Sequence, residues 1–224
     1  MTFKSIIMAG AALTLIACGS GDDAKKTATD MADKAKAEMS MKADSAKLAT
    51  ILAAQADTAK ARYDARNPQA TLEFFGIAPG MTVVEALPGG GWYSKILIPY
   101  LGDEGHLVGV DYPINMWSEF GGRLSSPEFI EGKKTWAAEW VEGAKAWQAG
   151  TTGNISAFTF DGRDTEMDGK ADAVLFIRAL HNLSRFEEKG GYMTQALADT
   201  HALLKPGGIV GVVQHQGPES NSDE

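Results

Sequence analysis

Five short apolar runs, each ended by a polar or glycine-rich stretch, are the main pattern of this chain. They cover residues 81–87, 106–110, 155–160, 171–177 and 209–213. The segments between them place apolar residues at helical spacing. Strands that are apolar at nearly every position are typical of a parallel sheet whose two faces are both covered. The pattern therefore predicts an α/β fold, with a Rossmann-like, mostly parallel sheet and helices on both faces.

Local signals set the expected helix boundaries. Asn67-Pro68 predicts the start of a helix, with Asn67 as the cap. Ser184-Arg-Phe-Glu187 has the form of a capping box and predicts a single helix from there to about Leu204. Lys205-Pro-Gly-Gly208 then predicts a turn that separates this helix from the last strand.

Upstream of this pattern, residues 24–65 are rich in Ala, Lys, Asp, Met and Thr and contain neither Pro nor Gly. This composition favours helix, so we expect a helical stalk before the α/β domain. Large apolar residues are sparse before Leu48, which favours a solvated spacer over a coiled-coil helix, because a coiled coil needs large residues along its whole seam. We therefore expect a spacer at 18–65 and the α/β domain at 66–224.

The first residues have the layout of an export signal. Lys4 precedes an apolar run at 6–16 that is too short to cross a bilayer as a mature helix. The run ends in Leu15-Ile16-Ala17-Cys18, which resembles the lipobox of bacterial lipoproteins; an ordinary cleaved secretory signal is the alternative. The resemblance implies that 1–17 is a signal peptide, that Cys18 is lipidated, and that the protein faces the periplasm from the cell envelope. Gly19 after the cysteine favours the outer membrane.

Charge and cysteine content exclude several classes of partner and site. The formal net charge of −8 and the pI of about 5.1 argue against binding to the phosphate backbone of nucleic acids. Cys18 is the only cysteine of the chain, which excludes an internal disulfide and a cysteine metal cluster.

The stretch Met81-Thr-Val-Val-Glu-Ala-Leu-Pro-Gly-Gly-Gly-Trp-Tyr-Ser94 carries the strongest functional signal. It reads as a strand that ends in an acid, a glycine-rich turn and the start of a helix. Glycine lets a ligand approach the backbone, and the free N–H groups at a helix start favour negative ligand groups. Open α/β sheets bind nucleotide-like ligands at such strand ends.

Acids also end the next two strands. Asp111 ends the second strand, where it would accept hydrogen bonds from ribose hydroxyls, and Asp161 ends the third. This order of strands and acids resembles the class I S-adenosylmethionine-dependent methyltransferases. The motifs that carry the resemblance are Phe74–Glu85, Pro-Gly-Gly-Gly-Trp-Tyr, Arg-x-x-His-Asn and Leu-Lys-Pro-Gly-Gly. The resemblance covers roughly 66–215 and is strongest to a group of exported, lipoprotein-type bacterial members.

The resemblance implies S-adenosylmethionine as the cofactor and assigns roles to individual residues. Glu85 with the glycines Gly89, Gly90 and Gly91 would surround the methionine part, Asp111 would hold the ribose, and Asp161 would lie near the adenine amine. The family motif is acid-x-Gly-x-Gly-x-Gly, and Leu87 replaces its first glycine here.

Two features depart from the family. Its members close the sheet with two more strands, whereas the sequence after His215 is polar and has no strand pattern. We therefore expect the C-terminal strands to be missing, an open sheet edge beside the fifth strand, and self-association along that edge. In addition, S-adenosylmethionine is made in the cytoplasm, so a protein of the cell envelope needs a separate supply of the cofactor.

Candidate catalytic residues follow the last two strands. Arg178, His181 and Asn182 follow the fourth strand and His215 follows the fifth, so both histidines could open onto one cleft. Histidine serves as a general base near neutral pH. The alternative is that His181 and Asn182 only cap backbone groups of the next turn. A metal site made by the two histidines and an acid is a further interpretation, and we expect no metal.

Three tryptophans, Trp136, Trp140 and Trp147, fall on one helical face. Such a stripe indicates core or a docking surface, and the alternative is a lid over an apolar substrate.

The sequence as a whole favours methyl transfer from S-adenosylmethionine to an unknown acceptor by a membrane-anchored lipoprotein. The alternative is a non-catalytic, lipid-anchored binding or scaffold protein with a degenerate methyltransferase fold. A nicotinamide-dependent oxidoreductase fits less well, because contiguous glycines stand in place of the Gly-x-Gly-x-x-Gly spacing.

Overall fold

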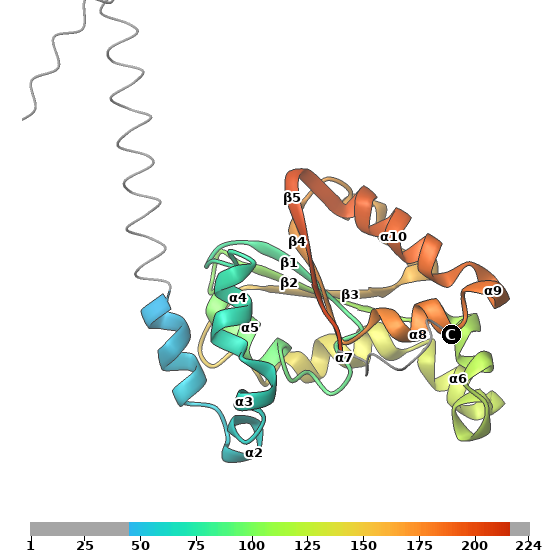
Figure 1. Ribbon diagram of the computed structural model, residues 1–224, viewed down its shortest axis with the longest axis horizontal. Helices are drawn as coiled ribbons and strands as arrows, with labels where there is room; N and C mark the ends of the chain where they lie inside the picture. The colour runs from blue at the N-terminus through green and yellow to red at the C-terminus, as the bar shows by residue number, and fades with distance from the viewer. Residues whose placement is uncertain (1–44, 216–224) are drawn as a thin grey trace, which may run out of the picture. The chain divides into compact units, whose positions relative to one another are not determined.

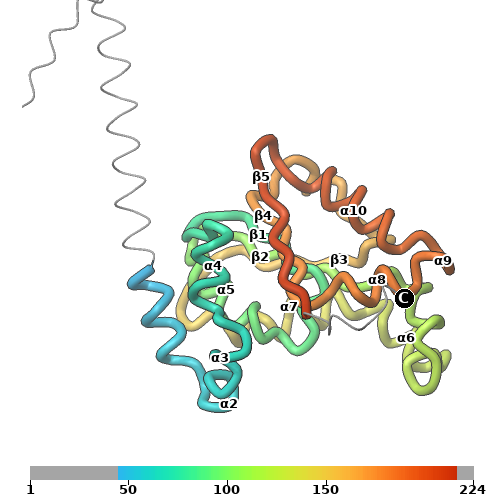
Figure 2. Tube along the Cα trace, viewed as in Figure 1, coloured from blue at the N-terminus to red at the C-terminus, as the bar shows by residue number. Residues whose placement is uncertain are grey.

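The computed structural model describes residues 45–215. The expected signal peptide, Cys18 and most of the expected spacer lie outside the described residues. Five parallel strands form one sheet in the order β3-β2-β1-β4-β5 (Figures 1 and 2). Their bounds are β1 Thr82–Ala86, β2 His106–Asp111, β3 Asn154–Thr159, β4 Ala171–Ile177 and β5 Leu204–Val213. The predicted α/β, Rossmann-like fold is confirmed.

Helices connect the strands. Residues 45–53 are helical. The α-helices that follow are α2 Asp57–Lys60, α3 Tyr63–Arg66, α4 Pro68–Phe74, α5 Ser94–Leu101, α6 Pro127–Lys133, α7 Trp136–Lys145, α8 Leu180–Arg185, α9 Glu187–Gly190 and α10 Tyr192–Leu203. Short 3-10 helices are η1 Ile114–Phe120, η2 Gly122–Ser125, η3 Phe160–Gly162 and η4 Thr165–Met167.

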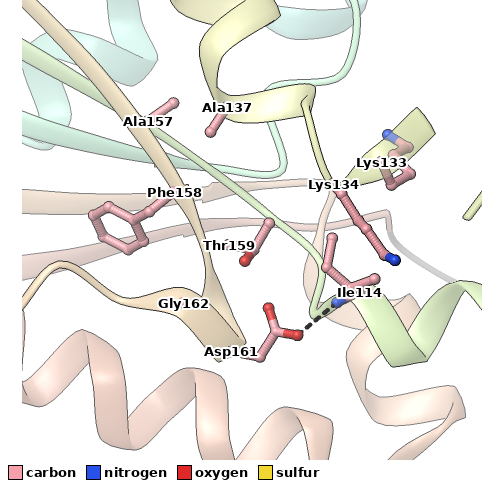
Figure 3. A pocket seen from close by; sticks show the side chains of 9 residues that line it. All are labelled: Ile114, Lys133, Lys134, Ala137, Ala157, Phe158, Thr159, Asp161 and Gly162. Carbon is pink, nitrogen blue, oxygen red and sulfur yellow. Dashed lines mark hydrogen bonds between the residues drawn. The ribbon is translucent and has the colours of Figure 1, made fainter. Parts of the chain in front are cut away.

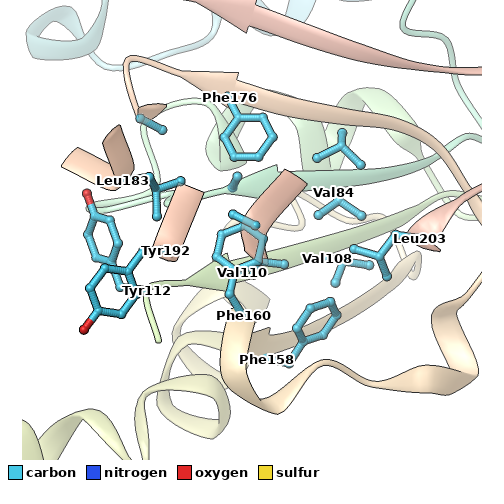
Figure 4. Close-up of a cluster of buried hydrophobic side chains, with 14 of the residues drawn as sticks. Val84, Val108, Val110, Tyr112, Phe158, Phe160, Phe176, Leu183, Tyr192 and Leu203 are labelled. Carbon is cyan, nitrogen blue, oxygen red and sulfur yellow. The ribbon is translucent and has the colours of Figure 1, made fainter. Parts of the chain in front are cut away.

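Side chains that alternate along the strands build a core on each face of the sheet, as a strand period of two requires. On one face, Val84, Val110 and Phe176 pack with Leu183 of α8 and Leu203 of α10 (Figure 4). On the other face, side chains from the alternate strand positions pack with α5 and α7; this second core includes Val83, Leu107, Leu175, Leu97 and Trp140. Both faces are covered, which explains why the strands read as almost continuously apolar.

The start of the compact unit lies upstream of the expected boundary at residue 66. Leu48 and Leu52 are buried in the α5–α7 core, and all the described residues belong to one compact unit. The Tyr63 hydroxyl also donates a hydrogen bond to the Leu52 carbonyl (2.8 Å). Residues 45–65 therefore belong to the domain, and their two large leucines serve its core rather than a solvated spacer.

Three local expectations need correction. Asn67 does precede α4, but it has a positive φ of 40° and its side chain donates to the Asp64 carbonyl instead of capping α4. Ser184 lies inside α8, and the helix expected at 184–204 is three helices. The Glu187 carboxylate still caps a helix, because it accepts from the Met193 and Thr194 N–H groups in the first turn of α10.

The Lys205–Gly208 segment is a bulge within β5 and not a turn before it. Leu204 pairs with Ala171, and the next pair joins Ile209 to Ala173. Four residues of β5 therefore oppose one residue of β4. The pairing of β5 with β4 begins at Leu204, whereas the Pro-Gly-Gly sequence predicted that the strand begins at Ile209.

The tryptophan stripe belongs to the core. Trp140 is buried over Gly109 of β2, where an added Cβ would meet its ring at 2.9 Å, and its ring contacts those of Trp136 and Trp147. The core interpretation is confirmed, and Gly109 has no side chain because the indole occupies that space.

Candidate functional site at the carboxyl ends of the strands

β2 and β3 lie on one side of β1 in the sheet, whereas β4 and β5 lie on its other side. The switch point of the sheet is therefore between β1 and β4. Open α/β sheets bind ligands at this switch point, beyond the carboxyl ends of the strands. The Leu87 N–H, just after β1, donates to the Val110 carbonyl of β2 (2.6 Å). The Arg178 N–H, just after β4, donates to the Val213 carbonyl of β5 (2.7 Å). The segment after β1 thus turns toward β2, and the segment after β4 turns toward β5, away from each other.

The first residue after β1 and the first residue after β4 both have a strained backbone. Leu87 has φ 58° and Arg178 has φ 60°, in the left-handed region that costs a non-glycine residue about 1–2 kcal/mol. Such residues cluster at functional sites, where the surrounding structure holds them. Leu87 stands where the family motif has its first glycine, and the backbone follows a left-handed path there without one.

Glu85 is the buried acid of the switch point. It is 4% exposed and lies on the α5 side of the sheet, where the Ser94 hydroxyl at the start of α5 donates to its Oε2 atom (2.6 Å). Burial raises the pKa of Glu85 to about 7, and the Ser94 hydrogen bond and the Arg66 charge oppose that rise. Near neutral pH this carboxyl group can therefore both accept and donate hydrogen bonds.

The glycines after Glu85 divide into two roles. A Cβ on Gly89 or Gly90 would meet no atom within 4 Å, and Gly89 has a positive φ of 53°. Their backbone therefore stands beside open space, as close ligand approach requires. Gly91 has φ 73°, and a Cβ there would clash with the Trp147 ring. The absence of a side chain at Gly91 therefore makes room for Trp147, which follows α7, and the predicted role of Gly91 at the cofactor stays a prediction.

Arg66 of α3 is a site residue that the sequence pattern did not indicate. Its guanidinium lies over the Trp92 ring, 4.6 Å from the ring centre, and the Tyr93 hydroxyl donates to its carbonyl (3.2 Å). Burial, with the charges of Arg178 and Arg62, lowers the pKa of Arg66, while Glu85 opposes this shift. Within residues 45–215 no carboxylate forms an ion pair with Arg66. This cation is therefore available to a ligand anion.

Asp111 ends β2 on the same face of the sheet as Glu85, and it is already paired. Lys133, the last residue of α6, places its Nζ 2.8 Å from Asp111 Oδ2. The same ammonium lies 4.0 Å from the centre of the Trp117 ring. No sequence pattern indicated Lys133, because α6 lies in a region without a strand pattern and the contact joins residues 22 positions apart.

Asp161 follows β3 and borders a pocket of about 490 Å³. Its Oδ2 accepts the Ile114 N–H (2.9 Å), which ties the end of β3 to the segment after β2. Figure 3 shows this hydrogen bond and the pocket, with Lys133 and Lys134 on the helix side and Thr159 and Asp161 at the end of β3. Ala137, Ala157 and Phe158 supply apolar surface. Such a lining suits a flat heteroaromatic ring with polar edges.

Three of the four candidate catalytic residues lie together. The Arg178 guanidinium donates from Nε to His215 Nε2 (2.7 Å). The His181 and His215 rings contact each other, with centroids 6.4 Å apart, and Gln214 pairs with His181 Nδ1 (3.0 Å). His181 and His215 lie together, as their positions after neighbouring strands predict, and Arg178 joins them. A shared cleft and the catalytic roles stay predictions.

Asn182 has a different partner. Its side-chain amide donates to the Tyr112 hydroxyl, directly after Asp111 (2.8 Å), and burial raises the pKa of this tyrosine. Neither His181 nor Asn182 caps a backbone group with its side chain, so the capping alternative is wrong. In the part of the chain that the structure describes, no three His, Cys, Asp or Glu side chains gather in a way that could hold a metal ion.

Comparison with known proteins gives similarities in solved structures only. No protein-family model and no curated protein matches the chain. A methyltransferase from Aquifex aeolicus, described as S-adenosylmethionine-dependent, is 19% identical, with 65% of this chain and 62% of that chain covered and a TM-score of 0.38. A complex of the Haloferax volcanii Trm112 activator with a putative methyltransferase gives 20% identity, 74% and 57% coverage, and a TM-score of 0.37.

A third similar structure is a variant of the 16S rRNA (adenine(1408)-N(1))-methyltransferase from Catenulisporales acidiphilia with its cosubstrate S-adenosylmethionine. It is 16% identical, with 64% and 55% coverage and a TM-score of 0.35. The chain thus spans less than two thirds of each of these proteins. At these values the function has to be inferred from the residues of the site itself.

Proposed function

We propose that this protein binds S-adenosylmethionine at the carboxyl ends of β1, β2 and β3 and transfers its methyl group to an acceptor that is still to be identified. The observation that carries the proposal is the arrangement of three acids on neighbouring strand ends. Glu85 and Asp111 lie on one face of the sheet, and Asp161 borders a pocket that is also lined by Lys133, the partner of Asp111. A glycine turn with open space lies next to Glu85.

The residues present fit such a cofactor. Glu85 would bind the ammonium of its amino-acid end, Asp111 the ribose hydroxyls, and Asp161 the amine of the adenine. Gly89 and Gly90 leave space along the backbone for close approach. The cofactor supplies an electrophilic methyl group on a sulfonium, so the protein mainly has to position the two reactants and accept one proton.

His181 is the better candidate for that proton. The Arg178 guanidinium donates to His215 Nε2 and so occupies the lone pair of that nitrogen. His181 is oriented through Nδ1 by Gln214. The Gln214 amide nitrogen donates to this atom, so the lone pair of neutral His181 is at Nδ1. Displacing a neutral amide to take a proton there costs less than displacing the guanidinium from His215.

Calorimetric titration of the mature, lipid-free chain with S-adenosylmethionine, S-adenosylhomocysteine and NAD tests the cofactor. We expect the two adenosyl ligands to bind and NAD to bind more weakly. Asp111→Ala should cost about 1–3 kcal/mol of binding, because the ribose loses its acceptor. Glu104→Ala, which changes an exposed acid on the connection before β2, is the control. Unchanged affinity in folded Asp111→Ala protein would refute the assignment.

A non-catalytic binding protein is the second candidate. The observation in its favour is the edge strand β5, which exposes Ile209, Val210 and Val212 among the described residues. A sheet edge of this kind binds another strand. Transfer of a labelled methyl group to any component of a cell-envelope extract separates the two candidates, since the binding protein would retain the ligand and transfer nothing.

We also propose that the protein belongs with the exported, lipoprotein-type methyltransferases and is anchored through Cys18, from the Leu15-Ile16-Ala17-Cys18 sequence. The described residues include no helix that is long and apolar enough to span a membrane. Mass spectrometry of the mature N-terminus checks the anchor: a diacylglyceryl-modified, acylated Cys18 supports it, and an unmodified terminus at or beyond Gly19 contradicts it.

A further inference from the structure

Lys133 lies between Asp111 and the pocket that borders Asp161. Its side chain lines the pocket, whereas Asp111 is not among the lining residues. Its ammonium is bonded to Asp111 Oδ2 at 2.8 Å, and the two side chains are 17% and 10% exposed. A ligand in the pocket therefore meets Lys133 before it can reach the acid.

Aromatic side chains hold the ammonium in this place. Lys133 Nζ is 4.0 Å from the Trp117 ring centre, 5.6 Å from that of Phe129 and 6.0 Å from that of Trp136. Cations over aromatic faces at such distances are attracted by the negative face of the ring. The Trp117 ring itself packs against Tyr112 and Phe120. The segment from η1 to α6 thus closes over the end of β2 as one aromatic cluster.

This closed arrangement leaves a polar group without a partner. Trp117 is 8% exposed, and its indole N–H is buried without an acceptor. A buried donor without an acceptor lowers stability, because it has lost its hydrogen bonds to water and gained none in return. A water molecule or a ligand acceptor that reached this N–H would give it a partner.

We propose that Lys133 is an internal competitor for the adenosine site: it occupies the carboxylate that a ribose needs, and an adenosyl ligand binds by displacing it. This inference rests on the proposed function. The displaced ammonium has a flexible four-carbon stem at the junction of α6 and α7, which allows it to move to the solvent-facing side of the pocket. The affinity of the site is then set by how firmly the aromatic cluster holds Lys133.

Lys133→Met tests the competition. Methionine has a similar length, carries no charge and packs well against aromatic rings. We expect S-adenosylhomocysteine to bind Lys133→Met about tenfold or more tightly than the unchanged protein, because a charged hydrogen bond no longer has to be broken. Lys134→Met is the matched control: Lys134 lines the same pocket but pairs with Glu131 at the surface, and its removal should leave the affinity unchanged.

Amine acetylation followed by peptide mass spectrometry provides a second readout in the unchanged protein, where folding of a variant is not in question. Lys133 should be protected without ligand and become reactive when S-adenosylhomocysteine is bound. Lys134, with its side chain 57% exposed, should react in both states.

The outcomes separate the two proposals. If the unchanged protein binds S-adenosylhomocysteine but Lys133→Met binds it equally or more weakly, and Lys133 stays protected, Lys133 orients Asp111 and the competition is overturned while the cofactor site stands. If neither protein binds the ligand, both the cofactor site and the competition are wrong.

Discussion

Individual residues at the switch point have properties that their neighbours in sequence do not impose. Glu85 is a buried acid with a raised pKa, and Leu87 and Arg178 keep a backbone conformation that suits glycine. Each is held by contacts from a different strand or helix: Ser94 for Glu85, Val110 for Leu87 and Val213 for Arg178. The surrounding structure holds these three residues in unfavourable states, and all three lie at the proposed cofactor site.

The raised pKa of Glu85 predicts a pH-dependent stability. Its pKa is about 7 when folded and 4.5 ordinarily, so the folded protein holds this proton more tightly than the unfolded chain. Stability contributed by the protonated group is therefore complete below pH 4.5 and is lost as the pH rises toward 7. The slope should approach about 1.4 kcal/mol per pH unit at its steepest.

Urea unfolding of the unchanged protein and of Glu85→Gln across this pH range measures the effect. Glutamine keeps an acceptor for the Ser94 hydroxyl but does not titrate, so the difference between the two proteins should grow in favour of the variant as the pH rises. Exposed Glu104→Gln is the control. A constant difference across the range would show that Glu85 does not carry this pKa.

The strain at Arg178 predicts an unusual order of stability for two small replacements. Both Arg178→Gly and Arg178→Ala remove the guanidinium, but only glycine is relaxed at φ 60°. We expect Arg178→Gly to be up to about 1 kcal/mol more stable than Arg178→Ala in chemical denaturation. At Leu197, an exposed position in the middle of helix α10, Leu197→Gly should instead be about 1 kcal/mol less stable than Leu197→Ala, because glycine is a poor helix former. The same order at both positions would contradict the strain.

Among the elements, the short helix α3 matters more to the site than its length indicates. It follows the segment at 45–53 that joins the core, and it places Arg66 against Trp92 and Tyr93, next to Ser94 and hence Glu85. The site thus combines an acid that would bind an ammonium with a cation that would bind a carboxylate. An amino-acid end of a ligand carries both groups.

Arg66→Ala should therefore weaken ligands that carry an amino-acid end and spare those that do not. We expect S-adenosylhomocysteine to lose about tenfold or more in affinity, the value of a charged hydrogen bond, while 5′-methylthioadenosine keeps its affinity. Paired titrations of the two ligands measure this difference. Exposed Arg62→Ala should affect neither. Equal losses for both ligands in Arg66→Ala would mean that Arg66 supports the fold and not the carboxylate.

For the molecule as a whole, the edge of the sheet is the feature that most affects its behaviour in solution. Phe75, directly after α4, packs over Gly211 of β5, so part of this strand is covered by the domain itself. Ile209, Val210 and Val212 nevertheless stay between 38% and 45% exposed. In the described residues β5 has β4 as its one partner, so its outer hydrogen-bonding edge is free to pair.

We expect the mature, lipid-free chain to self-associate through β5. Val212→Lys should shift it toward monomer in sedimentation velocity at rising concentration, because lysine on an edge strand opposes pairing. Leu197→Lys on α10 is a matched control, since Leu197 is 44% exposed and Val212 is 45% exposed. Equal behaviour of both variants would locate any association elsewhere, and a purely monomeric unchanged protein would remove the prediction.

The sequence by itself determined the sheet and the position of its acids. Runs of apolar residues mark all five strands because a parallel strand is buried on both faces, and the end of a strand follows directly from where its run stops. Glu85, Asp111 and Asp161 were therefore predictable as neighbours, as was the meeting of Arg178, His181 and His215 after β4 and β5. These relations depend on strand order and on local pattern alone.

Only the tertiary structure decided what each acid faces. Lys133, at the end of α6, contacts Asp111, and Arg66, in α3, lies near the switch point. The sequence between each of these residues and its strand has no pattern that predicts the contact. The same holds for Leu48 and Leu52. Their segment has few large apolar residues and was predicted as a spacer, but the structure buries both leucines in the core. The physical reason is that pairing of charges and burial of single side chains depend on distances in space, whereas periodicity records only which way a residue points within its own element.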